Sequence, residues 1–150
     1  MATTPNSIIT PQTPYSVTAS LSGVSACTSR GPTADGSMTS TPIFGVALVP
    51  TSTNGRRIDK ISINGCSTTV GGATVAATVI LWISNGTTAY PFDEITIPVV
   101  TPSATTPALV ITKDYSGLVL PAAFKMYVST TVATTAATNA MCVTAFGGDY

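Results

Sequence analysis

From about residue 42 to the end of the chain, apolar and polar residues alternate with the two-residue period of β-strands. The segment 74–84 shows this most clearly, because apolar residues fall on both sides of the alternation. One side carries Val75, Val79, Leu81 and Ile83, and the other side carries Thr78, Ile80 and Trp82. A strand with two apolar faces is predicted to be covered, at least in part, on both sides of its sheet.

Further segments are rich in β-forming residues and bounded by turn residues. They are 42–50, 56–64, 94–100, 108–112, 117–121, 124–132 and 140–146. In 94–100 the alternation places Ile95, Ile97 and Val99 together on one face. Pro98 lies among them, and because proline cannot donate a backbone hydrogen bond, it favours an edge strand or a bulge.

Asn-Gly pairs separate several of these segments, at residues 54–55, 64–65 and 85–86. Such a pair accepts positive φ at both positions, which tight hairpin turns require. The nearest candidate for an amphipathic helix is 130–140, and its Thr and Val residues disfavour a helix. About eight short strands at regular spacing therefore predict an all-β fold, a jelly-roll-like antiparallel β-sandwich, over residues 42–150.

Residues 1–41 differ from the rest, because they mix Thr, Ser, Pro and Gly with few apolar clusters. The prolines favour extended chain over helix. Two interpretations are open: a flexible tail, or an extended Pro/Thr-rich arm that becomes ordered against neighbouring subunits. The apolar residues Ile8, Ile9 and 15–21, which could also add a short strand, favour the arm. The predicted domains are an N-terminal arm at 1–41 and a β-sandwich at 42–150, and the sandwich is expected to fold without the arm.

Charged residues make up only 8% of the chain, against about 25% in a typical globular protein. Six basic and six acidic residues give a formal net charge of zero. A nucleic-acid surface needs clustered Lys and Arg, and the cluster of Arg56, Arg57 and Lys60 also contains Asp59. A solvated strand end explains that cluster better. A surface of Thr, Ser, Ala and Val suits contact with other protein subunits, although secreted adhesins share it.

The chain contains no histidine, which excludes Ser-His-Asp and Cys-His nucleophilic sites and His-ligated zinc or iron. The cysteines, Cys27, Cys66 and Cys142, are far apart and form no Cys-x-x-Cys pair. An odd number of cysteines fits a disulfide framework poorly. We therefore expect buried free thiols at Cys66 and Cys142, which lie in apolar segments.

Asp93 and Glu94 are adjacent carboxylates, and paired carboxylates can serve acid–base catalysis or bind metal ions. On a strand, successive side chains point to opposite faces, so these two do not converge on one substrate. We interpret them as a charged strand start that discourages edge pairing.

Three short motifs are weaker candidates. The Asn-Gly-Thr motif at 85–87 matches the glycosylation acceptor pattern but is explained by a turn. The glycines at 71–72 lack the Lys and the helix of a phosphate loop, and Asp-Gly-Ser at 35–37 lacks the other oxygen ligands of a calcium loop. The sequence therefore predicts no catalytic, cofactor-binding or metal-binding residue and no cofactor.

A set of aromatic residues could form a sugar-binding platform or could pack in the core or in an interface. The set is Tyr90, Phe92, Tyr115, Phe124, Tyr127 and Phe146. Core or interface packing is the preferred interpretation, because several of them fall at strand-face positions. Trp82 in particular is predicted to be a core or inter-sheet residue.

The first residues, MATTPNSIITPQTP, lack the basic segment and continuous apolar stretch of a signal peptide. The longest apolar run, around 75–83, is far shorter than the roughly 20 residues that cross a bilayer. We therefore expect no membrane contact, and a protein that is made and kept in a cytoplasm until it assembles.

The second half of the chain resembles a family of small virion structural proteins of tailed bacteriophages. The motifs that carry the resemblance are RIDKISING (57–65), DEITIPV (93–99), TPSATTPAL (101–109), GLVLPAAFKMYVST (117–130) and VTAFGGDY (143–150). Their order and spacing also match. The resemblance covers roughly residues 56–150 and does not reach the Pro/Thr-rich N-terminal part.

The resemblance implies a non-enzymatic β-sandwich component of the particle, most plausibly a capsid decoration or cement protein on the capsid exterior. Its expected partners are the major capsid protein or other virion proteins, and copies of itself, with a trimer favoured. Neither nucleic acid nor membrane is an expected partner. A component of the neck, tail or a fibre, which could also touch a host surface glycan, is the alternative. The family offers no catalytic residues to carry over.

Overall fold

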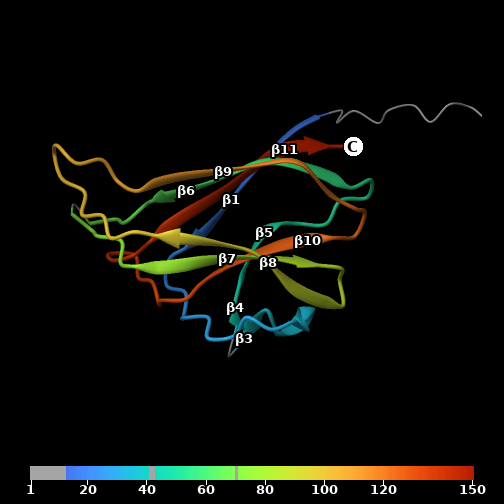
Figure 1. Cartoon of the computed structure of the whole chain (residues 1–150), viewed down its shortest axis with the longest axis horizontal. Coiled ribbons are helices and arrows are strands. Elements are labelled where there is room, and N and C mark those ends of the chain that lie inside the picture. The colour runs from blue at the N-terminus through green and yellow to red at the C-terminus, as the bar shows by residue number, and fades with distance from the viewer. Residues whose placement is uncertain (1–12, 41–42, 70) are drawn as a thin grey trace, which may run out of the picture.

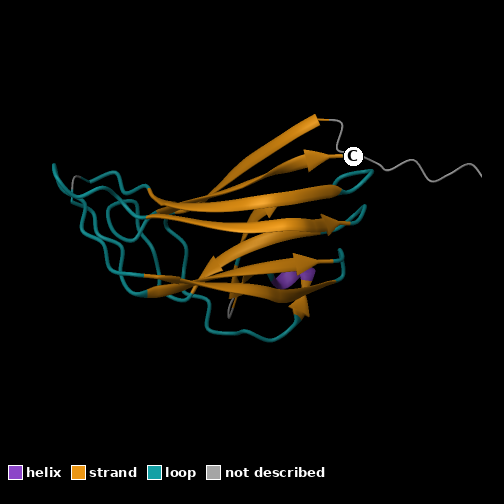
Figure 2. Ribbon diagram, turned by 45° about the horizontal axis from the view of Figure 1, so that its top comes forward, coloured by secondary structure: helices purple, strands orange, loops and turns teal. Residues whose placement is uncertain are grey.

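A computed structural model describes residues 13–40, 43–69 and 71–150 of the chain. Two β-sheets pack face to face, as Figures 1 and 2 show, and the described residues contain no α-helix. The strands are β1 (Thr13–Leu21), β2 (Thr33–Ala34), β3 (Thr39–Ser40), β4 (Ile43–Phe44), β5 (Val46–Val49), β6 (Arg56–Gly65), β7 (Ala77–Ser84), β8 (Thr88–Ile97), β9 (Val110–Leu120), β10 (Lys125–Thr130) and β11 (Met141–Asp149), with a 3-10 turn η1 (Asp35–Ser37).

The strand order is that of a jelly roll. The four-stranded sheet has the order β1-β11-β6-β9, and the five-stranded sheet has the order β2-β8-β7-β10-β5. Without the short strands β2 to β4, eight long strands remain. They pair from the outside inwards along the chain: β1 with β11, β5 with β10, β6 with β9 and β7 with β8. All these pairs are antiparallel, and the nested pairing defines the jelly roll. The predicted fold class is confirmed.

The main core lies between the two large sheets. It contains Val79 and Leu81 of β7, Ile95 and Ile97 of β8, and the inward row of β6. The opposite face of β7 carries Ile80 and Trp82, which are also fully buried. The prediction that this strand is covered on both sides is therefore confirmed.

A second, smaller core covers the outer face of the five-stranded sheet. There the segment that precedes β5 places Cys27, Met38 and Ile43 against residues of the sheet. The sheet contributes Ile80, Trp82, Ala89 and Tyr127. The Trp82 indole Nε1 donates a hydrogen bond to Ser129 Oγ at 2.8 Å. Trp82 is thus a core residue, and it lies in the second core rather than between the two large sheets.

The N-terminal region needs a correction. Strand β1 pairs with β11 along its whole length, from Thr13 opposite Asp149 to Leu21 opposite Met141, and Leu21 is fully buried. The short strand expected within 15–21 is confirmed, but the sandwich does not begin at residue 42. A chain without residues 1–40 would lack β1 and part of the second core, so the structure favours the opposite prediction, that the sandwich needs these residues to fold. Ile8 and Ile9 lie outside the described residues.

Two of the three Asn-Gly pairs lie in turns, and only the pair at 85–86 lies in a hairpin, because β5 and β6 belong to different sheets. The positive φ predicted at both positions of each turn is found at the glycine and not at Asn54 or Asn85. Gly55 and Gly86 have φ of 90° and 87° and lie in the turns before β6 and between β7 and β8. The pair at 64–65 instead lies inside β6, where strands on both sides pair with it. Ladder hydrogen bonds on both edges therefore outweigh the local turn preference.

Strand boundaries differ from the predictions at two further points. The segments 108–112 and 117–121 were expected as two strands, and they belong to the single strand β9, which continues through Gly117 at a φ of 90°. Strand β8 ends at Ile97, immediately before Pro98, so Val99 does not join the core face and is 64% exposed.

Candidate functional site

At one end of the sandwich, three long loops gather, and we call these loops the long-loop end. The loops are 66–76, 98–109 and 131–140, and they follow β6, β8 and β10. They leave the sandwich at the same end, on the left in Figure 1, because Gly65 pairs with Met141 in one sheet and Ala77 pairs with Ile97 in the other. The segment 22–32 leaves β1 beside them and is hydrogen-bonded to the third loop through Val24 and Thr134. Over the residues that the structure describes, the connections between strands at the opposite end are short: 50–55, 85–87 and 121–124.

The long-loop end carries no charge. None of its three loops contains Asp, Glu, Lys or Arg, and Ser and Thr supply most of its polar side chains. The charged side chains lie elsewhere and neutralise one another. Ion pairs join Arg30 to Glu94, Arg56 to Asp149, Arg57 to Asp59, Lys113 to Asp93, and Lys125 to Asp35. The remaining two, Lys60 and Asp114, face each other across β6 and β9.

Hydrogen bonds hold the loops of this end together. Ser67 Oγ donates to the carbonyl of Ala137 at 2.6 Å, and the Thr68 amide donates to the carbonyl of Ala136 at 2.8 Å. The hydroxyl of Thr74, which is buried, donates to the Pro98 carbonyl at 2.8 Å. These bonds connect all three loops, so the surface is preorganised and loses little conformational entropy on binding a partner.

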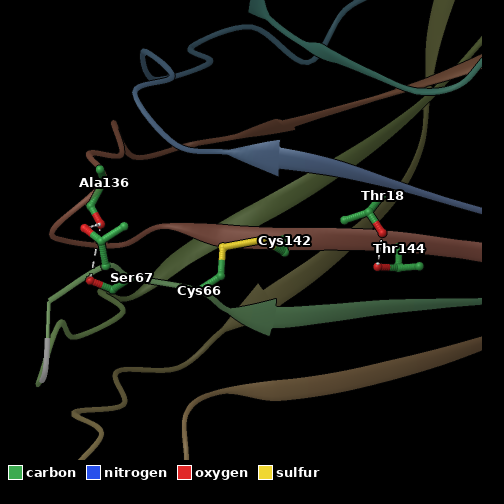
Figure 3. Close-up of a disulfide and its surroundings, with 7 residues drawn as sticks. Thr18, Cys66, Ser67, Ala136, Cys142 and Thr144 are labelled. Carbon is green, nitrogen blue, oxygen red and sulfur yellow. Dashed lines mark hydrogen bonds between the residues drawn. A yellow bond between two sulfur atoms is a disulfide. The ribbon is translucent and has the colours of Figure 1, made fainter.

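A disulfide also braces the long-loop end. Cys66 follows β6 and Cys142 lies near the start of β11, with their Cα atoms 5.9 Å apart (Figure 3). The expectation of free thiols at Cys66 and Cys142 is therefore wrong. The two positions are 76 residues apart in sequence, and only the pairing of β6 with β11 brings them together. Cys27 is buried and free.

Exposed valines lie at the same end. Val75 is 39% exposed, Val99 64% and Val110 66%. The segment before β7 and the segment after β8 continue the antiparallel register of the two strands, because Thr74 pairs with Val100 and Ala77 pairs with Ile97. In this register, Val75 lies opposite Val99. An uncharged surface with adjacent exposed apolar side chains is typical of the centre of a protein–protein interface.

A hollow of about 170 Å³ opens between the first two loops. Its lining includes Ser67, Thr69, Thr74, Pro102, Ser103 and Leu109. The residues that line the hollow thus supply hydroxyl and apolar groups, and none of them carries a carboxylate, an amine, an imidazole or a thiol.

Asp93 and Glu94 point to opposite faces of β8, as predicted, but they lie in the middle of the strand rather than at its start. The Asp93 carboxylate accepts a hydrogen bond from the Tyr115 hydroxyl and pairs with Lys113 Nζ at 2.5 Å. Glu94 pairs with Arg30 at 2.6 Å. Burial opposes ionisation of Asp93, but the hydrogen bonds from Lys113 and Tyr115 outweigh it and lower the pKa of Asp93. Both carboxylates are thus engaged in structural contacts.

The other charged candidates have structural partners as well. Asp35, from the motif at 35–37, accepts a hydrogen bond from Ser84 and pairs with Lys125 Nζ at 2.6 Å. The three basic residues of 56–60 diverge: the Arg56 side chain is only 12% exposed and pairs with Asp149, whereas Lys60 lies over the Phe146 ring. They form no common basic surface.

The aromatic candidates do not form one platform. Tyr127 is buried, and Tyr115 and Phe124 pack partly against the main core. Tyr90, Phe92 and Phe146 are exposed, but the first two lie on β8 and Phe146 lies on β11 of the other sheet. The prediction of core packing is therefore confirmed for Tyr127 and in part for Tyr115 and Phe124, and not for the three exposed aromatic residues.

A row of hydroxyl side chains crosses the outer face of the four-stranded sheet. Its members, in register from β1 to β9, are Thr18, Thr144, Ser62 and Thr112. The Thr18 and Thr144 hydroxyls lie 2.8 Å apart, as Figure 3 shows. The row itself is thus polar and uncharged, and on the same face Lys60 lies opposite Asp114, two residues away along β6 and β9.

One feature of the sequence could have predicted that the long-loop end is uncharged, although the overall composition does not show it. No charged residue occurs in 61–92, 95–112 or 126–148. Each loop of the long-loop end lies inside one of these runs. Only the strand order, however, shows that the three loops gather at one end.

Within the described part of the chain, no three His, Cys, Asp or Glu side chains are placed so that they could hold a metal ion. Over the same residues, no helix has the length and apolar character needed to span a membrane. No protein-family model, no curated protein and no solved structure matches the chain significantly.

Proposed function

We propose that the protein is a non-enzymatic virion structural protein, a capsid decoration or cement protein that stabilises a phage head by bridging capsid subunits. The observation that carries the proposal is the long-loop end: uncharged, cross-linked by hydrogen bonds, and presenting exposed valines. Such a surface loses little entropy on docking and requires no desolvation of charge.

Two further observations support the proposal. The jelly roll is an architecture that recurs in viral capsid proteins, although it also occurs in lectins and cupins, so this support is an analogy of fold. The motifs within residues 56–150 resemble those of small virion proteins of tailed bacteriophages. Neither observation depends on the charge-free end.

The partners that we propose are the major capsid protein or other virion proteins, together with copies of the chain itself, with a trimer favoured. We propose no nucleic-acid and no membrane partner. The chain would be made in the host cytoplasm and would occupy the capsid exterior. Because cytoplasmic thiols are kept reduced, the bridge between Cys66 and Cys142 would close only after the particle is released.

The chain offers a matched pair of substitutions for testing the docking surface. Val99 lies at the long-loop end and is 64% exposed, whereas Val119 lies near the other end of β9 and is 49% exposed. We expect Val99→Asp to weaken binding to heads that lack the chain by at least about tenfold, as for a hot-spot residue. Val119→Asp adds the same charge and should bind like the wild type.

The measurement is cosedimentation of each purified variant with such heads. If both variants bind like the wild type, the long-loop end is not the docking surface. If the wild type binds neither heads nor any other part of the particle, the virion function itself is wrong.

The second candidate function is a neck, tail or fibre component that contacts a host surface glycan. The exposed rings of Tyr90 and Phe92 on β8 favour it, because aromatic faces stack on sugar rings. Glycan-array binding by the isolated protein, lost in a Tyr90→Ala/Phe92→Ala variant, would support this candidate over the first.

A further inference from the structure

The three Asn-Gly pairs of the chain share a chemical reactivity that the proposed function does not use. In such a pair, the backbone nitrogen of the glycine can attack Cγ of the asparagine side chain, because glycine has no side chain to block the approach. Ammonia leaves, a cyclic succinimide forms, and water then opens the ring to aspartate or isoaspartate. The reaction needs an asparagine side chain that can rotate and a glycine amide that is free to attack.

Neither of these two conditions is met by the pair at 64–65. Asn64 lies within β6, opposite Cys142 on one side and Val110 on the other. The Gly65 amide donates a hydrogen bond to the Leu109 carbonyl at 2.8 Å. Ring closure at Asn64 would therefore require the sheet to open locally.

The pair at 85–86 is fixed by its own turn. The Asn85 Oδ1 atom accepts hydrogen bonds from the amides of Thr87 and Thr88, at 2.9 and 2.8 Å. The Gly86 amide donates to Ser84 Oγ at 3.0 Å, and Ser84 in turn donates to Asp35. Both the attacked group and the attacking group are thus engaged.

In the pair at 54–55, no hydrogen bond restrains either reacting group, although the Gly55 backbone is buried beside the Leu120 carbonyl. Asn54 is exposed in the connection between β5 and β6. Among the described residues, no hydrogen bond engages the Asn54 side chain or the Gly55 amide, and the Gly55 carbonyl accepts one from the Tyr150 amide at 3.3 Å. The side chain can therefore rotate toward an amide that no acceptor holds.

We propose that Asn54 is a selective deamidation site, which converts to aspartate and isoaspartate while Asn64 and Asn85 remain amides in the folded protein. The conversion adds one carboxylate to a chain whose formal net charge is zero and whose charged side chains are all matched. Asn54 lies at the opposite end of the sandwich from the long-loop end. Aged protein thus becomes more acidic without a change at the proposed docking surface.

Peptide mapping by mass spectrometry tests the proposal directly. Trypsin cleaves after Arg30, Arg56, Lys60 and Lys113, so peptide 31–56 carries Asn54, and peptide 61–113 carries Asn64 and Asn85. After incubation of the folded protein at mildly alkaline pH, we expect the amide-to-acid mass gain in 31–56 at least about tenfold faster than at either other site, since those sites must first open.

Two controls make the result decisive. In urea, where the sheet is absent, the three asparagines should react at similar rates, which shows that the structure protects two of them. The variant Asn54→Gln should accumulate no acidic species on ion exchange over the same period. Equal rates at the three sites in the folded protein, or conversion of Asn64 or Asn85 before Asn54, would overturn the proposal.

Discussion

At the scale of single residues, Asp93 shows how this chain uses its few charges. Its carboxylate reaches from β8, at one side of the five-stranded sheet, to Lys113 and Tyr115 of β9, the edge strand of the four-stranded sheet. Charges that point inward from edge strands disfavour edge-to-edge pairing with other chains. Burial raises the pKa of the Tyr115 hydroxyl, and its hydrogen bond to Asp93 raises that pKa further. The acid pair is therefore a structural device.

The pKa of Asp93 gives a prediction for acid stability. Its folded-state pKa is lowered, so it stabilises the fold above the unfolded pKa of about 3.9 and this contribution is lost as pH falls through the folded-state pKa. We expect Asp93→Asn to reduce the free energy of unfolding at pH 7 by about 1 kcal/mol, since solvent partly screens the pair. Urea unfolding from acid to neutral pH should show the difference shrinking below about pH 4.

A matched control is Asp114→Asn, on the exposed side of β9, which we expect to change stability little. If the Asp93→Asn variant differed from the wild type by the same amount at every pH, the carboxylate would not be the source of the stabilisation.

At the scale of secondary-structure elements, the chain segment before β5 belongs to the sandwich. Strand β1 forms one edge of the four-stranded sheet, and the segment after it covers the outer face of the other sheet. The Ser and Thr residues of β1 alternate with core residues such as Ala19 and Leu21, and the former face solvent. Composition alone therefore suggested an arm for a strand in which Ala19 and Leu21 are buried and Tyr15 and Val17 pack partly against the core.

Truncation distinguishes the two views of the N-terminal region. We expect deletion of residues 13–21 together with everything before them to prevent cooperative folding, because β1 and the buried Leu21 are lost. A milder version, Leu21→Ala, should cost about 2–5 kcal/mol, the usual range for a buried leucine. Circular dichroism and urea unfolding provide the measurement. Cooperative unfolding of the truncated chain at wild-type stability would show that β1 is dispensable.

The disulfide predicts a second effect at this scale. In the chain-entropy description, closing a loop across 76 residues stabilises a fold by roughly 4.5 kcal/mol. We expect the Cys66→Ser/Cys142→Ser variant to lose about that much, and the wild type to lose a similar amount in reductant. The control for the effect of reductant is Cys27→Ser, which removes the free thiol and keeps the bridge, so its stability should fall in reductant as that of the wild type does. An unchanged urea midpoint on reduction of the wild type would contradict the prediction.

Sequence reasoning succeeded where the cause is local and failed where the cause is the topology. The period of two assigned Val79 and Leu81 to one face and Ile80 and Trp82 to the other, because alternation is a property of the strand itself. The bridge from Cys66 to Cys142 depends on which strands become neighbours, and no local pattern encodes that. The matching of charges and the gathering of three uncharged loops have the same origin.

At the scale of the whole molecule, the two ends of the jelly roll differ in chemistry. One end carries long, uncharged loops, and the other carries short turns close to the ion pair of Arg56 with Asp149. With its charges matched in pairs, the molecule presents no large field of either sign. Association through such a surface depends on shape and apolar contact rather than on electrostatic steering.

The dependence of binding affinity on salt concentration tests whether association uses an uncharged surface. Exposed charges are screened at high ionic strength, so an interface built on them weakens as salt is added. We expect the affinity of the chain for phage heads to change by less than about threefold between low and high salt, because the long-loop end contributes no charge. Cosedimentation over a salt series provides the measurement. A steep loss of affinity with salt would place the docking surface elsewhere on the molecule.

The most direct measurement is cryo-electron microscopy of intact virus particles purified from cells that produce the chain, as the proposed function requires. The proposal predicts density on the head exterior that fits the jelly roll, with the loops 66–76, 98–109 and 131–140 against the capsid shell. Density in the neck, tail or a fibre would favour the second candidate. Particles with no density for the chain at any position would contradict a role in the virion.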